Sequence, residues 1–190
     1  MSQIRVGFAM CGSFCTFHKA IPEMERLVSL GYDVIPILSQ TAYMTDTRFG
    51  KAAGFIEKIE KCTGNEIIHT VFSAEPIGPK KLLDALVIAP ATGNTIAKLA
   101  NGITDTSVTL ACKAHLRNAR PVLIAVSTND ALGAAAKNIG LLLNAKNIYF
   151  VPMRQDDAQN KPNSIVADFS KIPDALDSAL KGEQIQPVLL

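Results

Sequence analysis

Short aliphatic runs alternate along this chain with segments in which apolar positions recur at helical spacing. The runs predict β-strands at residues 4–10, 33–38, 85–89, 121–126 and 148–151. The segments between and after them predict helices at 22–30, 47–62, 95–100, 107–118, 131–143 and 172–181. Strands that alternate with helices are typical of βαβ units. The pattern therefore predicts an α/β fold with a three-layer, Rossmann-like or flavodoxin-like open parallel sheet and helices on both faces.

Glycine and proline divide the pattern further. Pro36 removes a ladder donor from the second strand, which we therefore expect near an edge of the sheet. The run 85–89 is almost entirely aliphatic, as in a central parallel strand, and Pro90 is expected to end it. Gly31 is expected to close the first helix, which would begin at Pro22. The stretch 75–79 is expected to be irregular, and 154–164 has the composition of a polar loop.

Length, charge and cysteine content restrict the number of domains, the class of partner and the expected location of the protein. The 190 residues, of which 48% are hydrophobic and 19% charged, suffice for one core, so we expect a single domain over 1–190. A net charge of +2 without charge runs disfavours nucleic acid and anionic membranes as partners. We expect a cytoplasmic protein because neither a membrane-spanning stretch nor a signal peptide is evident. The four scattered cysteines fit reduced thiols better than a metal site, and no metal is expected.

The loops that follow the predicted strands carry the candidate chemistry, because ligands of open parallel sheets bind at the carboxyl ends of the strands. These loops are short and rich in hydroxyl and amide groups. They contain the candidate cofactor-binding residues Gly12, Ser13, Ser39, Thr41, Ala91, Thr92, Asn94, Thr95, Ser127 and Asn129. Such residues also serve as ordinary helix N-caps, which accounts well for any one loop. Four such loops at one edge of the same sheet favour a site for a phosphate or a polyol.

The spacing of the glycines and the residue after the second strand indicate which kind of nucleotide could bind. A dinucleotide fold has G-x-G-x-x-G after its first strand and an acidic residue at the end of its second strand. Gly7 and Gly12 have the wrong spacing, and Ser39 stands where the carboxylate would be. Binding of NAD by this chain is therefore disfavoured, and a mononucleotide such as FMN fits better.

Residues 89–105, APATGNTIAKLANGITD, also carry a family resemblance. They are similar to the P-A-S-A-N-T loop and following helix of the FMN-binding flavoproteins that include phosphopantothenoylcysteine decarboxylase, peptidyl-cysteine decarboxylases and flavin prenyltransferases. The Gly12-Ser13 turn and the Ser39-x-Thr41 loop match the other cofactor contacts of that family. Within the family the chain most resembles a subunit from spore-forming bacteria, on stretches 45–50, 74–80, 127–133, 155–157 and 161–164. The similarity runs from about residue 4 to 187.

The resemblance implies an oxidoreductase subunit that acts in the mother cell during sporulation. Its reaction would convert dihydrodipicolinate to dipicolinate, and aromatising the ring requires a hydride acceptor. The implied cofactors are FMN on this chain and NAD(P) on a separate A subunit, without which this chain would be inactive. The resemblance also implies a homo-oligomer, and the mean hydropathy of +0.19 agrees with buried contact surface. We expect Ser127 and Asn129 near the flavin ring, and Arg48 is a candidate for holding a substrate carboxylate.

Two other functions remain open. The chain could be a scaffold or partner-binding subunit whose pocket holds phosphate or nothing. A free-standing FMN-dependent decarboxylase or prenyltransferase is less favoured, because the decarboxylases have a His before the central strand and a P-x-M-N segment after the next one. Here Lys81-Leu82-Leu83-Asp84 and Ser127-Thr128-Asn129-Asp130 stand at those places. His18, nearest to the Gly-Ser turn, is the only histidine considered as a base, and the catalytic residues stay unassigned.

Overall fold

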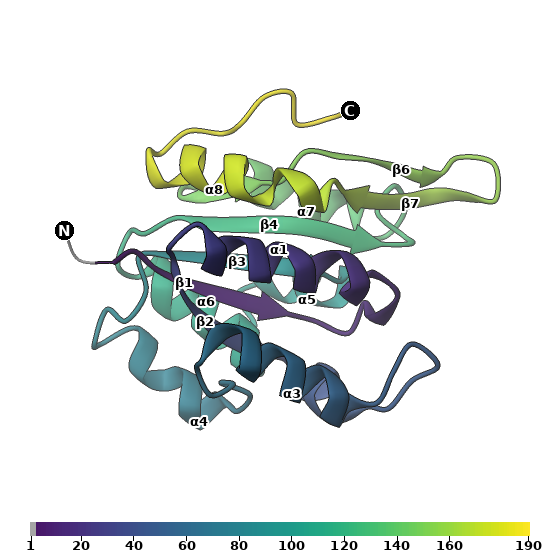
Figure 1. Ribbon diagram of the computed structural model, residues 1–190. Helices are drawn as coiled ribbons and strands as arrows, with labels where there is room; N and C mark the ends of the chain where they lie inside the picture. The colour runs from purple at the N-terminus through teal and green to yellow at the C-terminus, as the bar shows by residue number, and fades with distance from the viewer. Residues whose placement is uncertain (1–2) are drawn as a thin grey trace.

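The computed structural model describes residues 3–190, whose strands form one seven-stranded sheet (Figure 1). The strand order is β2-β1-β3-β4-β7-β6, and β5 pairs with β4 beside this path. The strands are β1 (Arg5–Met10), β2 (Asp33–Leu38), β3 (Ala85–Ala91), β4 (Val122–Thr128), β5 (Ile148–Phe150), β6 (Met153–Asp157) and β7 (Lys161–Ala167). β1 to β5 pair in parallel, whereas β7 is antiparallel to both β4 and β6. The predicted α/β fold is confirmed, and β2 is the edge strand that Pro36 indicated.

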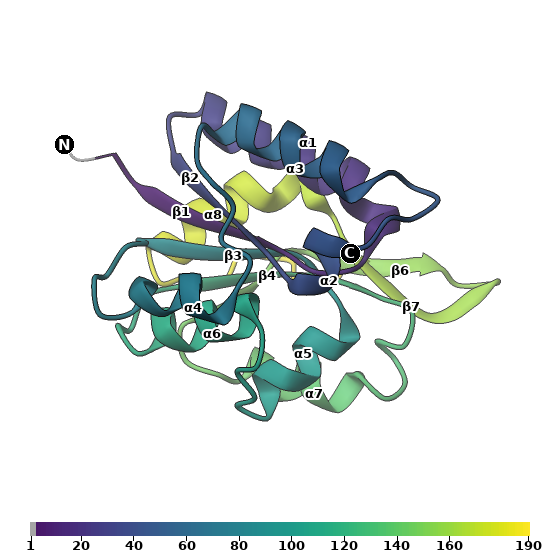
Figure 2. The same ribbon diagram turned by 90° about the horizontal axis from the view of Figure 1, so that it is seen from below.

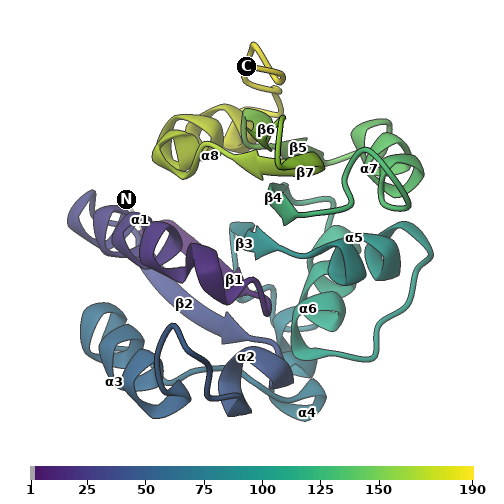
Figure 3. The ribbon, with the colours of Figure 1, turned by 90° about the vertical axis from the view of Figure 1, so that its right-hand side faces the viewer.

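Helices cover both faces of the sheet, so the three layers are also confirmed (Figures 2 and 3). The helices are α1 (Phe17–Ser29), α2 (Gln40–Met44), α3 (Ala52–Thr63), α4 (Val71–Ala74), α5 (Gly93–Ala100), α6 (Ser107–Leu116), α7 (Ala136–Leu143) and α8 (Ile172–Leu180), with the 3-10 turns η1 (Phe14–Thr16), η2 (Glu75–Ile77) and η3 (Phe169–Lys171). α1, α3 and α8 lie on one face, and α4 to α7 lie on the other (Figure 2). Each face has its own apolar core, and every residue of β3 is buried between them.

The segment 154–164 is a correction to the sequence prediction, because it forms a β-hairpin instead of a loop. Asp157 makes the turn, where its Oδ1 accepts hydrogen bonds from the amides of Gln159 and Asn160. β7 pairs with Ser127 and Thr128, the last two residues of β4, beyond the point where β5 ends. Ser127 and Thr128, expected in a loop, are therefore strand residues.

Pro90 does not end the central strand. β3 runs through Pro90 to Ala91, and its register against β4 shifts between Ile88 and Ala91. The shift removes the need for a ladder donor at Pro90. The carbonyl of Pro90 still accepts a hydrogen bond from the amide of Cys11 at 3.2 Å, which ties β3 to the loop after β1.

Three predicted helix starts were also wrong. α1 begins at Phe17, five residues before Pro22, because Phe17, Ala20 and Met24 already lie on its buried face and this burial outweighs one missing hydrogen bond. α3 begins only at Ala52, whose amide donates to Asp46 Oδ1. α7 begins at Ala136 instead of 131, since the chain before it makes turns, with the amide of Leu132 bonded to the hairpin carbonyl of Asn163.

Short helices account for the remaining differences. α2 follows Ser39 directly, and α4 with η2 occupies 71–77, where the sequence predicted an irregular stretch over 75–79. The C-terminal helix agrees with its prediction to within one residue. Within residues 3–190 no helix has the length and apolarity that crossing a membrane requires.

Candidate functional site

A cavity of ≈ 890 Å³ opens at the carboxyl edge of β1, β3 and β4, where the sequence placed the ligand site. Its walls come from the β1–α1 loop, the start of α5, the end of β4 and the β6–β7 hairpin. The lining residues are Gly12, Ser13, Phe14, Cys15, Thr16, Lys19, Phe49, Thr92, Gly93, Asn94, Ser127, Thr128, Asn129, Asp130, Asp156, Lys161, Ser164, Ile165 and Val166. The volume lies within the range of about 300–1,000 Å³ that small-molecule sites occupy.

Three hydroxyl groups meet on one wall of the cavity. Ser13 Oγ lies 2.8 Å from Ser127 Oγ, and Thr16 Oγ1 lies 3.3 Å and 3.4 Å from the same two atoms. Thr16 Oγ1 also donates to the carbonyl of Ser13 at 2.8 Å. The group joins the loop after β1 to the end of β4, which are far apart in sequence. Each hydroxyl can donate or accept, so the cluster can turn its free hydrogen or lone pair toward a ligand.

The start of α5 forms a second wall. Thr92 caps the helix by accepting a hydrogen bond from the amide of Thr95, and Gly93 and Asn94 form the first turn. Amides of a first turn have no acceptor inside the helix and are available to a ligand. Thr128 Oγ1 donates a short hydrogen bond to Asp130 Oδ1 beside this turn. A Cβ at Gly93 would lie 2.7 Å from both atoms, so a larger residue here would displace these two side chains.

Two lysines and two aspartates line the cavity. Lys19 lies in the first turn of α1, and Lys161 begins β7. Lys161 Nζ lies 2.8 Å from Asp156 Oδ2 on β6, and this hydrogen bond raises the pKa of Lys161 above its ordinary value. None of the ion pairs found over residues 3–190 includes Lys19.

The structure divides the predicted site residues into two groups. Six of them line the cavity together, although they come from segments far apart in sequence: Gly12, Ser13, Thr92, Asn94, Ser127 and Asn129. Ser39, Thr41, Ala91, Thr95 and Arg48 do not line it. Ser39 caps α2 by accepting from the amide of Ala42.

The other four predicted residues that do not line the cavity have the following positions and contacts. A Cβ at Gly12 would lie 3.3 Å from Thr41 Cγ2, so Thr41 backs the Gly12 turn. Thr95 is buried and bonded to Thr92 Oγ1 at 3.1 Å, and Ala91 is buried at the end of β3. Arg48 stands in the exposed loop before α3, with its guanidinium 4.9 Å from the centre of the Phe49 ring.

Sequence reasoning assigned no site residue to the hairpin wall and missed Phe49 and Lys19. The hairpin residues carried a turn signal in Asp157 and Asn160, but their polar composition hid the strands. His18, the histidine considered as a base, is exposed on α1 and borders a smaller cavity that Phe17 and Phe55 also line. No group of three or more His, Cys, Asp or Glu side chains that could hold a metal occurs in the described part of the chain.

The thiols differ in accessibility. Cys11 and Cys112 are buried, and burial raises their pKa values to about 11 and about 12. They therefore behave as small apolar side chains at neutral pH. Cys15 is exposed at the cavity, with its Sγ 3.8 Å from Ser13 Oγ. All four cysteines are free thiols, as the sequence predicted.

Comparison with known proteins supports the fold and the family. The pattern of the Flavoprotein family matches residues 1–177. The B subunit of dipicolinate synthase from Bacillus subtilis is 47% identical over 186 residues, which are 98% of this chain and 93% of that protein. The crystal structure of the same dipicolinate synthase component from Bacillus halodurans superposes with a TM-score of 0.91 at 48% identity, covering 100% of this chain and 98% of that one.

A more distant structure shares the fold. DmrB of Burkholderia xenovorans, solved in complex with FMN and described as a cubic protein cage for redox transfer, has a TM-score of 0.69 at 19% identity, covering 94% of this chain and 96% of that one.

Proposed function

The chain belongs to the Flavoprotein family, and from this premise we propose that it is the B-type component of a dipicolinate synthase. In this role it binds FMN and oxidises dihydrodipicolinate to dipicolinate together with an NAD(P)-binding A subunit, in the mother cell of a sporulating bacterium. The observation that carries the proposal is the 47% identity to the Bacillus subtilis protein over nearly the full length of both chains. The name of that protein, as one subunit of a synthase, supports a partner chain.

The donors in the cavity suit a phosphate-bearing polyol. The hydroxyls of Ser13, Thr16 and Ser127 and the first-turn amides of α5 are neutral donors that can hold phosphate oxygens or ribityl hydroxyls. Asn94 and Asn129 add amide groups that can both donate and accept, as the heteroatoms of an isoalloxazine ring require. FMN bound here would supply a hydride acceptor. Thr41, Ala91 and Thr95 act behind the lining by fixing the loops that carry these donors.

The chain's own residues position the substrate and shield it. Ile165 and Val166 give the hairpin wall an apolar surface that can cover a planar ring. Oxidation removes a hydride and a proton from the dihydropyridine ring, which becomes aromatic while both carboxylates are retained. Because this chain lacks the dinucleotide fingerprint, we place the NAD(P) site on the partner chain.

Assays of the separate and mixed subunits test the proposal. The purified chain should show a flavin absorbance band or regain one when FMN is added. Dihydrodipicolinate oxidation, followed with NADP present, should require both this chain and the A subunit. Full turnover by this chain alone would refute the two-subunit assignment.

One observation favours the second candidate, a scaffold subunit without flavin. Asp130 places a carboxylate beside the first turn of α5, where it can occupy the position of an anionic ligand. A colourless chain that does not bind added FMN, together with full turnover by the A subunit alone, would support the scaffold function instead.

A further inference from the structure

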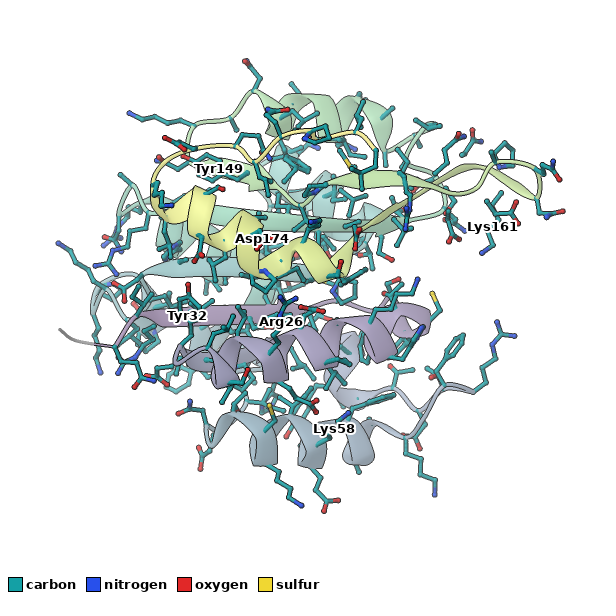
Figure 4. The ribbon with its side chains drawn as sticks, turned by 45° about the horizontal axis from the view of Figure 1, so that its top comes forward. Arg26, Tyr32, Lys58, Tyr149, Lys161 and Asp174 are labelled. Atoms are coloured by element: carbon teal, nitrogen blue, oxygen red, sulfur yellow. The ribbon has the colours of Figure 1, made fainter. Side chains whose placement is uncertain are left out.

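Two lysines from different elements line the same cavity. Lys19 belongs to the first turn of α1, and Lys161 stands at the beginning of β7. Figure 4 shows Lys161 on the hairpin, at the end of the molecule where the cavity opens. Cys15 in η1 also lines this cavity, so the hairpin and the β1–α1 loop border the same space. Because α1 starts directly after this loop, the two lysines border one opening.

The cavity is lined by two lysines and two aspartates, and these four charged residues are not all paired. Lys161 is held by Asp156, and Asp130 is held by Thr128 at the start of α5. Lys19 has no acidic partner within residues 3–190. An ammonium that faces a cavity without a counter-ion attracts an anionic ligand. The salt bridge to Asp156 holds the second ammonium in place and leaves its other hydrogens free to donate.

We propose that Lys19 and Lys161 hold the two carboxylates of the dicarboxylate substrate. The inference rests on the proposed function and replaces Arg48 as the substrate-holding cation. Arg48 does not line the cavity, and its guanidinium lies over the exposed ring of Phe49. The hydroxyl cluster and the α5 start are left for the cofactor, so the two ligands meet different donors.

Dipicolinate itself is a suitable probe, because both carboxylates survive the reaction and its binding needs no turnover. Titration calorimetry of the flavin-loaded chain should compare dipicolinate with pyridine-2-carboxylate, which lacks one carboxylate. Lys19→Gln and Lys161→Gln should each weaken dipicolinate binding by about tenfold, the low end for a charge-assisted hydrogen bond at an accessible site. The preference of the wild-type chain for the dicarboxylate should largely disappear in both variants, which a merely structural role would not produce.

Two further variants complete the test. Lys80→Gln changes an exposed lysine that precedes β3, at the amino edge of the sheet, and should leave dipicolinate affinity unchanged. Arg48→Gln tests the competing assignment. Unchanged affinity in both cavity variants, or a loss in Arg48→Gln instead, would overturn the inference. A wild-type chain that binds neither FMN nor dipicolinate would instead refute the proposed function, so the two failures are distinguishable.

Discussion

Replacing Asn94 by alanine separates cofactor binding from folding. Asn94 is exposed at the cavity in the first turn of α5, whose cap is made by Thr92 and Thr95 without it. Truncating an exposed side chain that takes no part in the cap changes the free energy of unfolding by no more than about 0.5 kcal/mol. Any larger loss of FMN binding free energy in the variant must therefore come from a lost contact with the ligand.

The expected loss follows from one hydrogen bond. A single neutral hydrogen bond contributes about 0.5–1.5 kcal/mol, which corresponds to a roughly 2- to 12-fold increase in the Kd for FMN. The amide can donate to a flavin oxygen or accept from the ring N–H, and alanine can do neither. The first-turn backbone amides remain in the variant, so binding should be weakened and not abolished.

Fluorescence titration of FMN gives the affinity, and chemical denaturation without FMN gives the stability. Asn101→Ala, at the other end of the same helix, is the matched control. Its Nδ2 donates to the carbonyl of Ala97 at 2.8 Å, so this variant should lose stability while keeping its FMN affinity. An Asn94→Ala chain with wild-type affinity, or one whose affinity falls only as far as its stability does, would refute the assignment of Asn94 to the cofactor.

Three other predictions concern the fold and its assembly. Gly7→Ala should lower the free energy of unfolding by about 1–3 kcal/mol, because its Cβ would lie 2.6 Å from Leu83 Cδ1 in a filled core, and a variant as stable as wild type in urea would contradict this. Burial lowers the pKa of His115 to about 4, so the unfolded chain takes up the proton first and stability should fall by up to about 3 kcal/mol between pH 6.5 and 4. His115→Gln should flatten that part of the stability profile, and an unaltered slope would exclude His115 as its source. The chain should self-associate through the helices of residues 95–118, and light scattering that shows a monomer would contradict this.

The parallel part of the sheet was predictable because its strands are buried on both faces. Such strands are continuous aliphatic runs, and the runs 85–89 and 121–126 lie in β3 and β4. The edge position of β2 followed from Pro36, because a regular central strand disfavours a missing donor, and β3 accommodates Pro90 only where its register against β4 shifts. Because parallel strands bring their carboxyl ends together, the six site residues that line the cavity could be grouped before any contact was known.

The hairpin could not be predicted in the same way, because its pattern is set by a neighbour. The first half of β4 pairs with β5 and leaves its end without a partner, and β7 fills that place through Ser127 and Thr128. β6 is exposed at the edge of the sheet, so its side chains are polar and resemble a loop in sequence. Lys19 and Lys161 belong to one site only because of this pairing, and nothing in their local sequence connects them.

The capping requirement separates structural hydroxyls from functional ones. Ser39 and Thr92 each accept a hydrogen bond from the amide three residues ahead, so helix capping is enough to explain them. Ser13 precedes η1 but its side chain makes no cap bond, and its hydroxyl is hydrogen-bonded to that of Ser127 in β4. Ser127 lies inside β4, where no helix needs a cap. Since capping does not account for a polar pair at this place, we expect substitutions of Ser13 and Ser127 to separate a ligand requirement from a folding requirement most clearly.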